Sequence, residues 1–328
     1  MVAPERAPWL TRWDGTRYKD AMWAYAFRRL LAAIPTLFAV VTVSFFMMRL
    51  TPGGPFDRER MLAPAVEANI NKAYHLDEPI VVQYGRYLAK ALQGDLGPSF
   101  KYPDYTVVEL IASGFPVSFR IGLSAIMLAL FVGGGLGIIA ALRQNRGVDH
   151  AVMAVAMIGI TIPNFVMAPL LTLVIGVHLR LLPVGGYGGG SLRNLILPTF
   201  ALALPPIAYI ARLTRASMVE VLRANYIRTA RAKGLPARLI IGRHALRAAF
   251  LPVLSYLGPA IAGIITGSVV IETIFGIPGI GRYFVQGALN RDYTLVMGVV
   301  VFYAALIILL NLLVDLAYGL LDPKIRYD

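Results

Sequence analysis

Residues 121–142 read IGLSAIMLALFVGGGLGIIAAL and contain no charged side chain. The hydrocarbon core of a bilayer is about 30 Å thick, which requires about 20 apolar residues in helical form. The run is continuous and does not alternate apolar with polar residues, so it favours a helix over a barrel strand. This stretch predicts a transmembrane helix.

Five further runs have a similar character. The six predicted spans are Leu30 to Met48, Ile121 to Leu142, Ala151 to Val177, Leu195 to Ala211, Ala248 to Ile271 and Tyr293 to Val314. The fourth is the shortest and contains three prolines, which leaves its ends open. We therefore predict an all-α polytopic membrane protein with six transmembrane helices.

The composition agrees with a lipid environment. The chain has 328 residues, of which 57% are hydrophobic and 15% are charged, against about 25% charged in soluble domains. It has no cysteine, which excludes disulfides, thiolate metal sites and a cysteine nucleophile. Its four histidines are far apart in the sequence, so we expect no metal site.

The net charge of +13 is explained by membrane orientation. With the N-terminus in the cytoplasm, the four inner segments carry 19 Lys and Arg residues and the three outer segments carry 10. This bias predicts that both termini are cytoplasmic. Nucleic acid is not needed as a partner to explain the charge.

The chain divides around these spans. Residues 1–26 form an N-terminal extension rich in Trp, Tyr and basic residues, which favours an interfacial segment over a contact with a partner subunit. Residues 27–49 hold the first helix, 50–115 an outer insertion, 116–318 the core with five helices and the cytoplasmic loop 212–247, and 319–328 a tail.

The outer insertion is longer than a connection requires. Within it, Ala65 to Ala73 and Pro79 to Leu92 are predicted as short helices. Three roles remain open for the insertion: receiving a soluble partner, capping a pore, or packing on the outer ends of the helices.

The cytoplasmic loop carries the most specific pattern. It reads Arg228-Thr229-Ala230-Arg231-Ala232-Lys233-Gly234-Leu235-Pro236 and continues with Arg243-His244-Ala245-Leu246-Arg247. Gly234 is suited to cap a helix and Pro236 to start the next one, which predicts a helix–turn–helix. Met218, Val221, Leu222, Asn225 and Tyr226 form a mostly apolar stripe at helical spacing. Taken alone, the basic residues need no role beyond topology.

This loop resembles the coupling motif of ABC-importer permeases, which reads Glu-Ala-Ala, three residues, then Gly. Arg228-Thr229-Ala230 and Gly234 occupy these positions. Arg228 replaces the Glu, and Arg247 stands where the general pattern has Pro. Both departures are typical of the peptide and nickel branch of the family.

Three other stretches resemble the B-type permease subunit of oligopeptide importers within that branch. They are the start of the first helix from Phe27, the outer segment Gly94-Asp95-Leu96-Gly97-Pro98-Ser99-Phe100, and Glu272-Thr273-Ile274-Phe275-Gly276-Ile277-Pro278-Gly279-Ile280-Gly281. The likeness runs from Phe27 to Tyr327.

The resemblance implies a type I permease fold and a subunit of an ATP-driven peptide importer in the bacterial inner membrane. Its partners would be a C-type permease subunit, two ABC ATPases that bind ATP and Mg²⁺, an extracytoplasmic peptide-binding protein, the bilayer and a peptide. The chain itself would bind no cofactor and would be no enzyme. The coupling residues would be Arg228, Thr229, Ala230, Arg231, Lys233, Gly234, Leu235, Pro236, His244 and Leu246.

Candidate residues of the pathway or its gate are Asn164, Glu272, Phe275, Pro278 and Gly279. A hydrogen bond across helices is favoured over a pathway role for Asn164. Dipeptide, murein-peptide, glutathione and nickel importers share the pattern, so these cargoes stay open. A secondary transporter is the rival class, but the six predicted spans contain no carboxylate or histidine to couple an ion.

Overall fold

A computed structural model describes residues 15–50, 75–102 and 104–321. All of its regular elements are helical. In the first half of the chain they are α1 (Gly15–Leu50), α3 (Ile80–Leu92), α4 (Val107–Leu128), η2 (Ala129–Gly133), α5 (Gly134–Leu142), α6 (Gly147–Thr161), α7 (Asn164–Leu171) and η3 (Thr172–His178). The rest are η4 (Gly188–Gly190), α8 (Leu192–Leu222), α9 (Asn225–Ala232), α10 (Ala237–Leu239), η5 (Ile240–Ala245), α11 (Leu246–Ala249), α12 (Leu251–Phe275), α13 (Ile280–Leu289) and α14 (Tyr293–Leu321).

The predicted spans are found with one change of shape. Within the described residues, five helices are long and apolar enough to cross a membrane, and the bent pair α6 and α7–η3 gives a sixth if it counts as one span. Ala151 to Val177 was predicted as one helix, but its two halves meet at 107°. Pro163 causes the break, because proline has no amide hydrogen and holds the preceding Ile162 in an extended conformation.

Several predicted boundaries also differ. The first helix begins at Gly15, so residue 27 does not start an element. The second span begins 14 residues early, at Val107, because Thr106 and Glu109 form a capping box at its N-terminus. Residues 107–115 therefore belong to the span and not to a separate insertion. Pro79 to Leu92 is helical as predicted, whereas Ala65 to Ala73 lies outside the described residues.

The centre of the bundle is α8, which packs against α4, α5, α6, α7 and α12. Glycines make the close approach possible. A Cβ atom on Gly133 would lie 2.6 Å from the carbonyl oxygen of Ile207, and one on Gly137 would lie 2.6 Å from that of Ala211. Gly159 of α6 approaches Leu204 in the same way.

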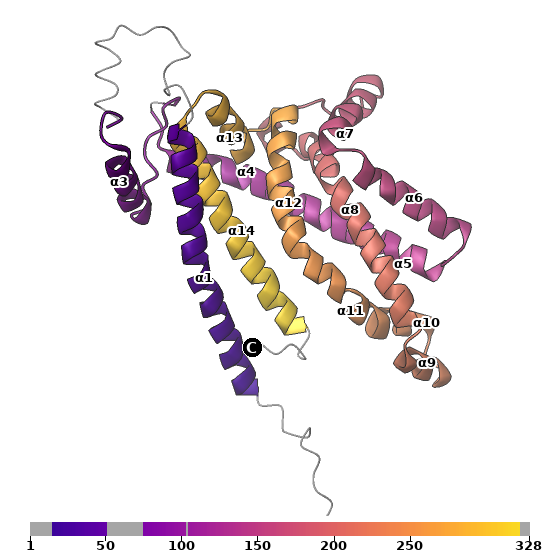
Figure 1. Ribbon diagram of the computed structural model, residues 1–328. Coiled ribbons are helices and arrows are strands. Elements are labelled where there is room, and N and C mark those ends of the chain that lie inside the picture. Colours follow the sequence, from indigo (N-terminus) through magenta and orange to yellow (C-terminus); the bar gives the residue numbers. More distant parts are fainter. Residues whose placement is uncertain (1–14, 51–74, 103, 322–328) are drawn as a thin grey trace, which may run out of the picture.

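The first helix stands at the edge. Figure 1 shows α1 beside α14, away from α8, and α3 lying against its upper part. The described part of α1 begins at the lower end of the bundle, where α14 ends and where α9 and α10 lie. The elements α3 and α13 lie at the opposite end.

The packing predicts different outcomes for two neighbouring glycines of α5. Gly137→Ala places a methyl group against the backbone of α8, which should cost about 1–3 kcal/mol because a helix backbone cannot retreat cheaply. Gly135→Ala is the matched control, since a Cβ there meets no atom within 4 Å. We expect only Gly137→Ala to lower the thermal unfolding midpoint of the purified complex, and equal midpoints would contradict the close contact.

Candidate functional site

The basic loop forms a compact cap on the lower end of the central helices. The long helix α8 ends at Leu222, and after a turn at Arg223 and Ala224 the chain continues as α9. Residues 212–222, predicted as part of the loop, are the last turns of α8. The helix–turn–helix itself consists of α9 and the pieces α10, η5 and α11.

The turn after α9 confirms the predicted roles of Gly234 and Pro236. Gly234 has φ = 75°, a left-handed conformation that favours glycine. Its amide donates to the carbonyl of Arg231 at 2.9 Å, and the amide of Leu235 donates to that of Ala230 at 3.3 Å. These two bonds form a Schellman motif that satisfies the helix end. Pro236 then caps the start of α10.

An apolar cluster attaches the loop to the spans. Ile227, Ala230 and Ile240 of the loop are buried with Met218 of α8 and Ala141 of α5.

The apolar stripe predicted from Met218 to Tyr226 therefore needs correction. It does not lie on one helix, and Val221 and Leu222 pack into this cluster, while the Tyr226 side chain is 48% exposed. The sequence pattern missed Ile227 because the turn at residues 223–224 shifts the helical phase.

The basic residues lie on the opposite side of the loop. Arg228, Thr229, Arg231 and Lys233 are exposed. Within the described ranges Arg228, Arg231 and Lys233 take part in no ion pair. His244 and Leu246 are half-buried, so they help to support the loop rather than extend its surface. The result is an exposed basic face on a base that is packed against α5 and α8.

An ion pair fastens the neighbouring turn to the same helix. Arg215 of α8 donates to both oxygens of Asp149 at 2.5 and 2.6 Å, and the Asp149 side chain is 1% exposed. The amide of Asn145 also donates to this carboxylate at 2.9 Å. No sequence pattern predicts this pair, because the two residues lie far apart in the chain.

A second group of predicted residues meets at the opposite end of α12. Gly276 ends α12 with φ = 64°, and the Ile277 amide donates to the carbonyl of Glu272 at 2.8 Å. The side chain of Glu272 is buried and accepts from the amide of Gly281, at the start of α13, at 2.8 Å. One residue therefore joins the end of α12 to the beginning of α13.

The glycines of this segment make room for the carboxylate. A Cβ on Gly279 would overlap the Glu272 carboxylate and would lie 2.6 Å from the Ser118 hydroxyl. Phe275 is buried, and its carbonyl accepts from the amide of Gly186 at 2.7 Å. Pro278 is half-buried in the same turn. Glu272, Phe275, Pro278 and Gly279 are thus brought together as a rigid corner.

Asn164 lies elsewhere. It begins α7 directly after the break at Pro163 and lines a cavity with Pro205, Pro206 and Tyr256. The structure therefore does not group Asn164 with the Glu272 corner. It places Asn164 where the bent third span meets α8 and α12.

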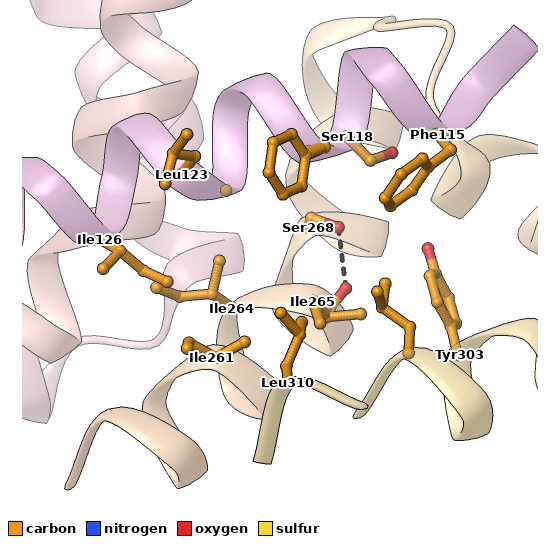
Figure 2. Close-up of a pocket in the computed structure, with 13 residues that line it drawn as sticks. Phe115, Ser118, Leu123, Ile126, Ile261, Ile264, Ile265, Ser268, Tyr303 and Leu310 are labelled. Carbon is orange, nitrogen blue, oxygen red and sulfur yellow. Dashed lines mark hydrogen bonds between the residues drawn. The ribbon is translucent and has the colours of Figure 1, made fainter. Parts of the chain in front are cut away.

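A further pocket lies between α4, α12 and α14 (Figure 2). It has a volume of about 110 Å³ and an apolar lining that includes Phe115, Phe119 and Ile265. Ser118, Ser268 and Tyr303 lie toward one end of the view, and the Ser268 hydroxyl donates to the carbonyl of Ile265 at 2.8 Å. No cluster of three or more His, Cys, Asp or Glu suited to a metal is found among the described residues.

Comparisons with known proteins agree with this architecture. The family described as "binding-protein-dependent transport system inner membrane component" matches residues 133–327. The chain is 58% identical to the oligopeptide transport system permease protein OppB of Salmonella typhimurium, over 93% of this chain and 100% of that protein. It is 49% identical to the dipeptide transport system permease protein DppB of Bacillus subtilis, over 92% of this chain and 97% of that protein.

A solved structure shows the same fold at low identity. The inward-facing MetNI methionine ABC transporter contains a chain with a TM-score of 0.56 and 16% identity, over 65% of this chain and 96% of that chain. The predicted fold class, an all-helical permease of the type I ABC-importer fold, is confirmed. The residues matched by the family include α8, the basic loop and the Glu272 corner. From its family match and its likeness to curated permeases over most of its length, the chain belongs to the binding-protein-dependent transport system inner membrane components.

Proposed function

We propose that this chain is the B-type membrane subunit of an ATP-driven importer for oligopeptides. The observation that carries the proposal is the basic loop, since a connection that only fixed topology would not need a capped helix pair packed on the central helix. The likeness to an oligopeptide permease over 93% of the chain supports the choice of cargo. Dipeptides are the second candidate, because a dipeptide permease is 49% identical.

The proposed assembly has four kinds of partner. A C-type permease subunit supplies the other half of the pathway, two cytoplasmic ABC ATPases bind ATP and Mg²⁺, and an extracytoplasmic protein delivers the peptide. This chain contributes no ATPase site, because its glycine-rich run at residues 185–190 lacks the Gly-Lys-Ser/Thr ending that cradles phosphates. It binds no cofactor of its own.

The loop couples the ATPases to the pathway in this proposal. Arg228, Arg231 and Lys233 face a groove on an ATPase, with Tyr226 inserted among them. Because Ile227 and Ile240 are buried against α5 and α8, a displacement of the loop is passed to those helices as a rigid-body movement. The corner at Glu272 and the break at Asn164 are the proposed gate positions, since Glu272 joins α12 to α13 and Asn164 follows the 107° bend of the third span.

The hypothesis of a secondary transporter is weaker than that of an importer subunit. Such a protein needs a titratable group that an ion can reach within its spans. Glu272 is the buried carboxylate nearest to that description, but it caps α13 through the amide of Gly281. That bond gives Glu272 a structural role without ion coupling.

Substitutions in the loop test the proposed function. In proteoliposomes with the complete importer, Gly234→Val and Arg231→Glu should each lower ATP-driven uptake of a labelled tetrapeptide by about tenfold. The first strains a left-handed residue and re-aims α10, at a cost of about 1–2 kcal/mol. The second reverses charge on the face proposed to meet the ATPase. Peptide-stimulated ATP hydrolysis should fall with uptake.

Two controls match these variants. Gly242→Val makes the same change at a loop glycine with open space and no positive φ. Arg146→Glu makes the same charge reversal at the exposed α5–α6 turn, on the same end of the bundle. Both should import normally. Normal uptake by Gly234→Val and Arg231→Glu would show that the loop is not part of the mechanism. Preferential uptake of a dipeptide would show that dipeptides, and not oligopeptides, are the cargo.

Orientation is tested by labelling single cysteines, since the chain has none of its own. We propose that the end of the bundle with α9 and α10 is cytoplasmic, together with both termini. Ser191→Cys, directly before α8, and Ala288→Cys, in α13 at the opposite end, are exposed and should react in intact cells with an impermeant thiol reagent. Arg231→Cys should react only after the membrane is opened. Labelling of Arg231→Cys in intact cells would reverse the orientation.

A further inference from the structure

A pocket with several polar side chains in its lining lies where α1 ends, where α14 begins and where α3 packs on α1. It has a volume of about 230 Å³, and its lining includes Phe45, Arg49, Gln83, Tyr87, Lys90 and Tyr293. A water molecule occupies about 30 Å³ in the liquid. The pocket is therefore large enough for a chemical group of several heavy atoms, and neither the coupling loop nor the Glu272 corner contributes to it.

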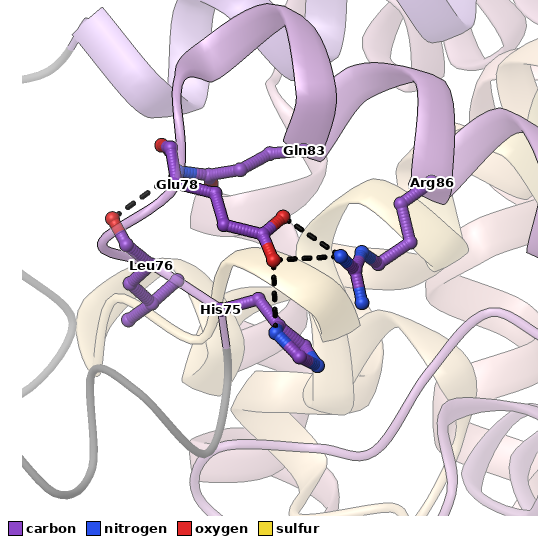
Figure 3. Close-up of polar contacts among 5 residues, drawn as sticks. All are labelled: His75, Leu76, Glu78, Gln83 and Arg86. Atoms are coloured by element: carbon purple, nitrogen blue, oxygen red, sulfur yellow. Dashed lines mark hydrogen bonds and ion pairs between the residues drawn. The ribbon is translucent and has the colours of Figure 1, made fainter.

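Three residues that line this pocket each have a buried polar atom without a hydrogen-bond partner among the described residues: Arg49 Nε, Gln83 Oε1 and Tyr87 Oη. The orientation of Gln83 is determined by its surroundings, because its Nε2 donates to the carbonyls of Leu76 at 3.1 Å and Glu78 at 2.7 Å. Figure 3 shows Gln83 in this arrangement, so its oxygen remains as an acceptor. Buried polar groups are nearly always paired, and three together indicate a ligand.

The basic residues of the pocket differ in whether a carboxylate lies beside them. Arg86 and His75 share the carboxylate of Glu78 at 2.6 and 3.1 Å (Figure 3), and Lys90 lies 3.8 Å from Asp95. The Arg49 guanidinium instead lies over the rings of Phe45 and Tyr293, at 5.6 and 5.8 Å from their centres. No ion pair of Arg49 is found in the described part of the chain. The pocket therefore carries a cation that lacks a counter-charge.

The phenol of Tyr87 supplies a second donor. Burial raises its pKa to about 12, so the hydroxyl keeps its proton at physiological pH and can donate. Arg49 Nε and Tyr87 Oη are two donors, and the positive charge of Arg49 favours an anionic acceptor. The oxygen of Gln83 can accept from a donor on the same ligand.

The position of the pocket identifies the source of such a group. Arg49 is in the last turn of an apolar span, and α1 packs on α14 and α3. The surface of α1 that precedes the pocket stays open, with Phe38 55% and Val43 56% exposed. Acyl chains would cover this surface, whereas a bound cargo peptide would leave it uncovered.

We propose that this pocket binds the headgroup of a phospholipid, with the phosphate accepting from Arg49 Nε and Tyr87 Oη and a headgroup ammonium or hydroxyl donating to Gln83 Oε1. The lipid would pin α3 to the junction of α1 and α14. The donor requirement selects phosphatidylethanolamine and phosphatidylglycerol over phosphatidylcholine, whose headgroup has no N–H or O–H. This role is separate from peptide uptake and does not rest on the identity of the cargo.

Native mass spectrometry of the intact importer, released from nanodiscs that contain equal amounts of these three lipids, tests the proposal. The wild-type complex should retain phosphatidylethanolamine or phosphatidylglycerol in preference to phosphatidylcholine. Tyr87→Phe and Arg49→Gln should each lower the occupancy of that lipid by about tenfold, because each removes a donor to a charged group. Gln83→Leu should abolish the discrimination against phosphatidylcholine.

Tyr84→Phe is the matched control. It removes the same hydroxyl from the same helix, but Tyr84 Oη already bonds to Thr42 Oγ1 at 2.6 Å and does not line the pocket. Its lipid occupancy should equal that of the wild type. If Arg49→Gln does not fold, Tyr87→Phe carries the test, since it deletes a single atom.

Three results would overturn the proposal. Equal lipid occupancy in the wild type and Tyr87→Phe would mean that the retained lipid binds elsewhere and that this pocket holds no headgroup. Loss of the retained lipid on addition of millimolar inorganic phosphate would make the site one for free anions. Displacement of the lipid by a labelled tetrapeptide, with Tyr87→Phe losing the peptide, would make it a cargo site.

Discussion

The close contact of α5 with α8 is the constraint on which the rest of the structure depends. Inside a bilayer the hydrophobic effect does not drive helices together, so association rests on close packing of small residues. Gly133 and Gly137 let the two backbones touch, and every element of the proposed mechanism is attached to this pair. The basic loop continues from α8, and the Asp149–Arg215 pair fastens the α5–α6 turn to the same helix.

This arrangement gives the chain two stiff regions and one open edge. The loop and the lower ends of α5 and α8 share an apolar cluster around Met218 and Ile227. At the opposite end, Glu272 holds α12 and α13 at a sharp corner. By contrast α1 contacts α14 and α3, and much of its apolar surface is exposed. A movement imposed on the loop therefore acts first on the central helices and not on α1.

Much of the fold could be predicted from the sequence, because a bilayer requires long apolar runs and a capped turn requires residues such as Gly234. The break at Pro163 was not predicted, since a proline inside an apolar run bends some helices and interrupts others. The capping box of Thr106 and Glu109 is a local signal that marks the true start of the second span. Long-range pairs such as Arg215 with Asp149, and the unpaired atoms near Arg49, depend on tertiary packing that no local pattern encodes.

We expect the loop to move as one rigid body with the central helices α5 and α8. Double electron–electron resonance between spin labels at Asn225→Cys in α9 and Arg143→Cys at the end of α5 tests this in the intact importer, since both sites are exposed and neither is a proposed coupling residue. If the loop and α5 move as one rigid body, the distance distribution should be the same without nucleotide and with trapped ATP, in complexes that still import peptide. A distance that changes with nucleotide would show that the loop moves relative to α5 and would contradict rigid-body movement.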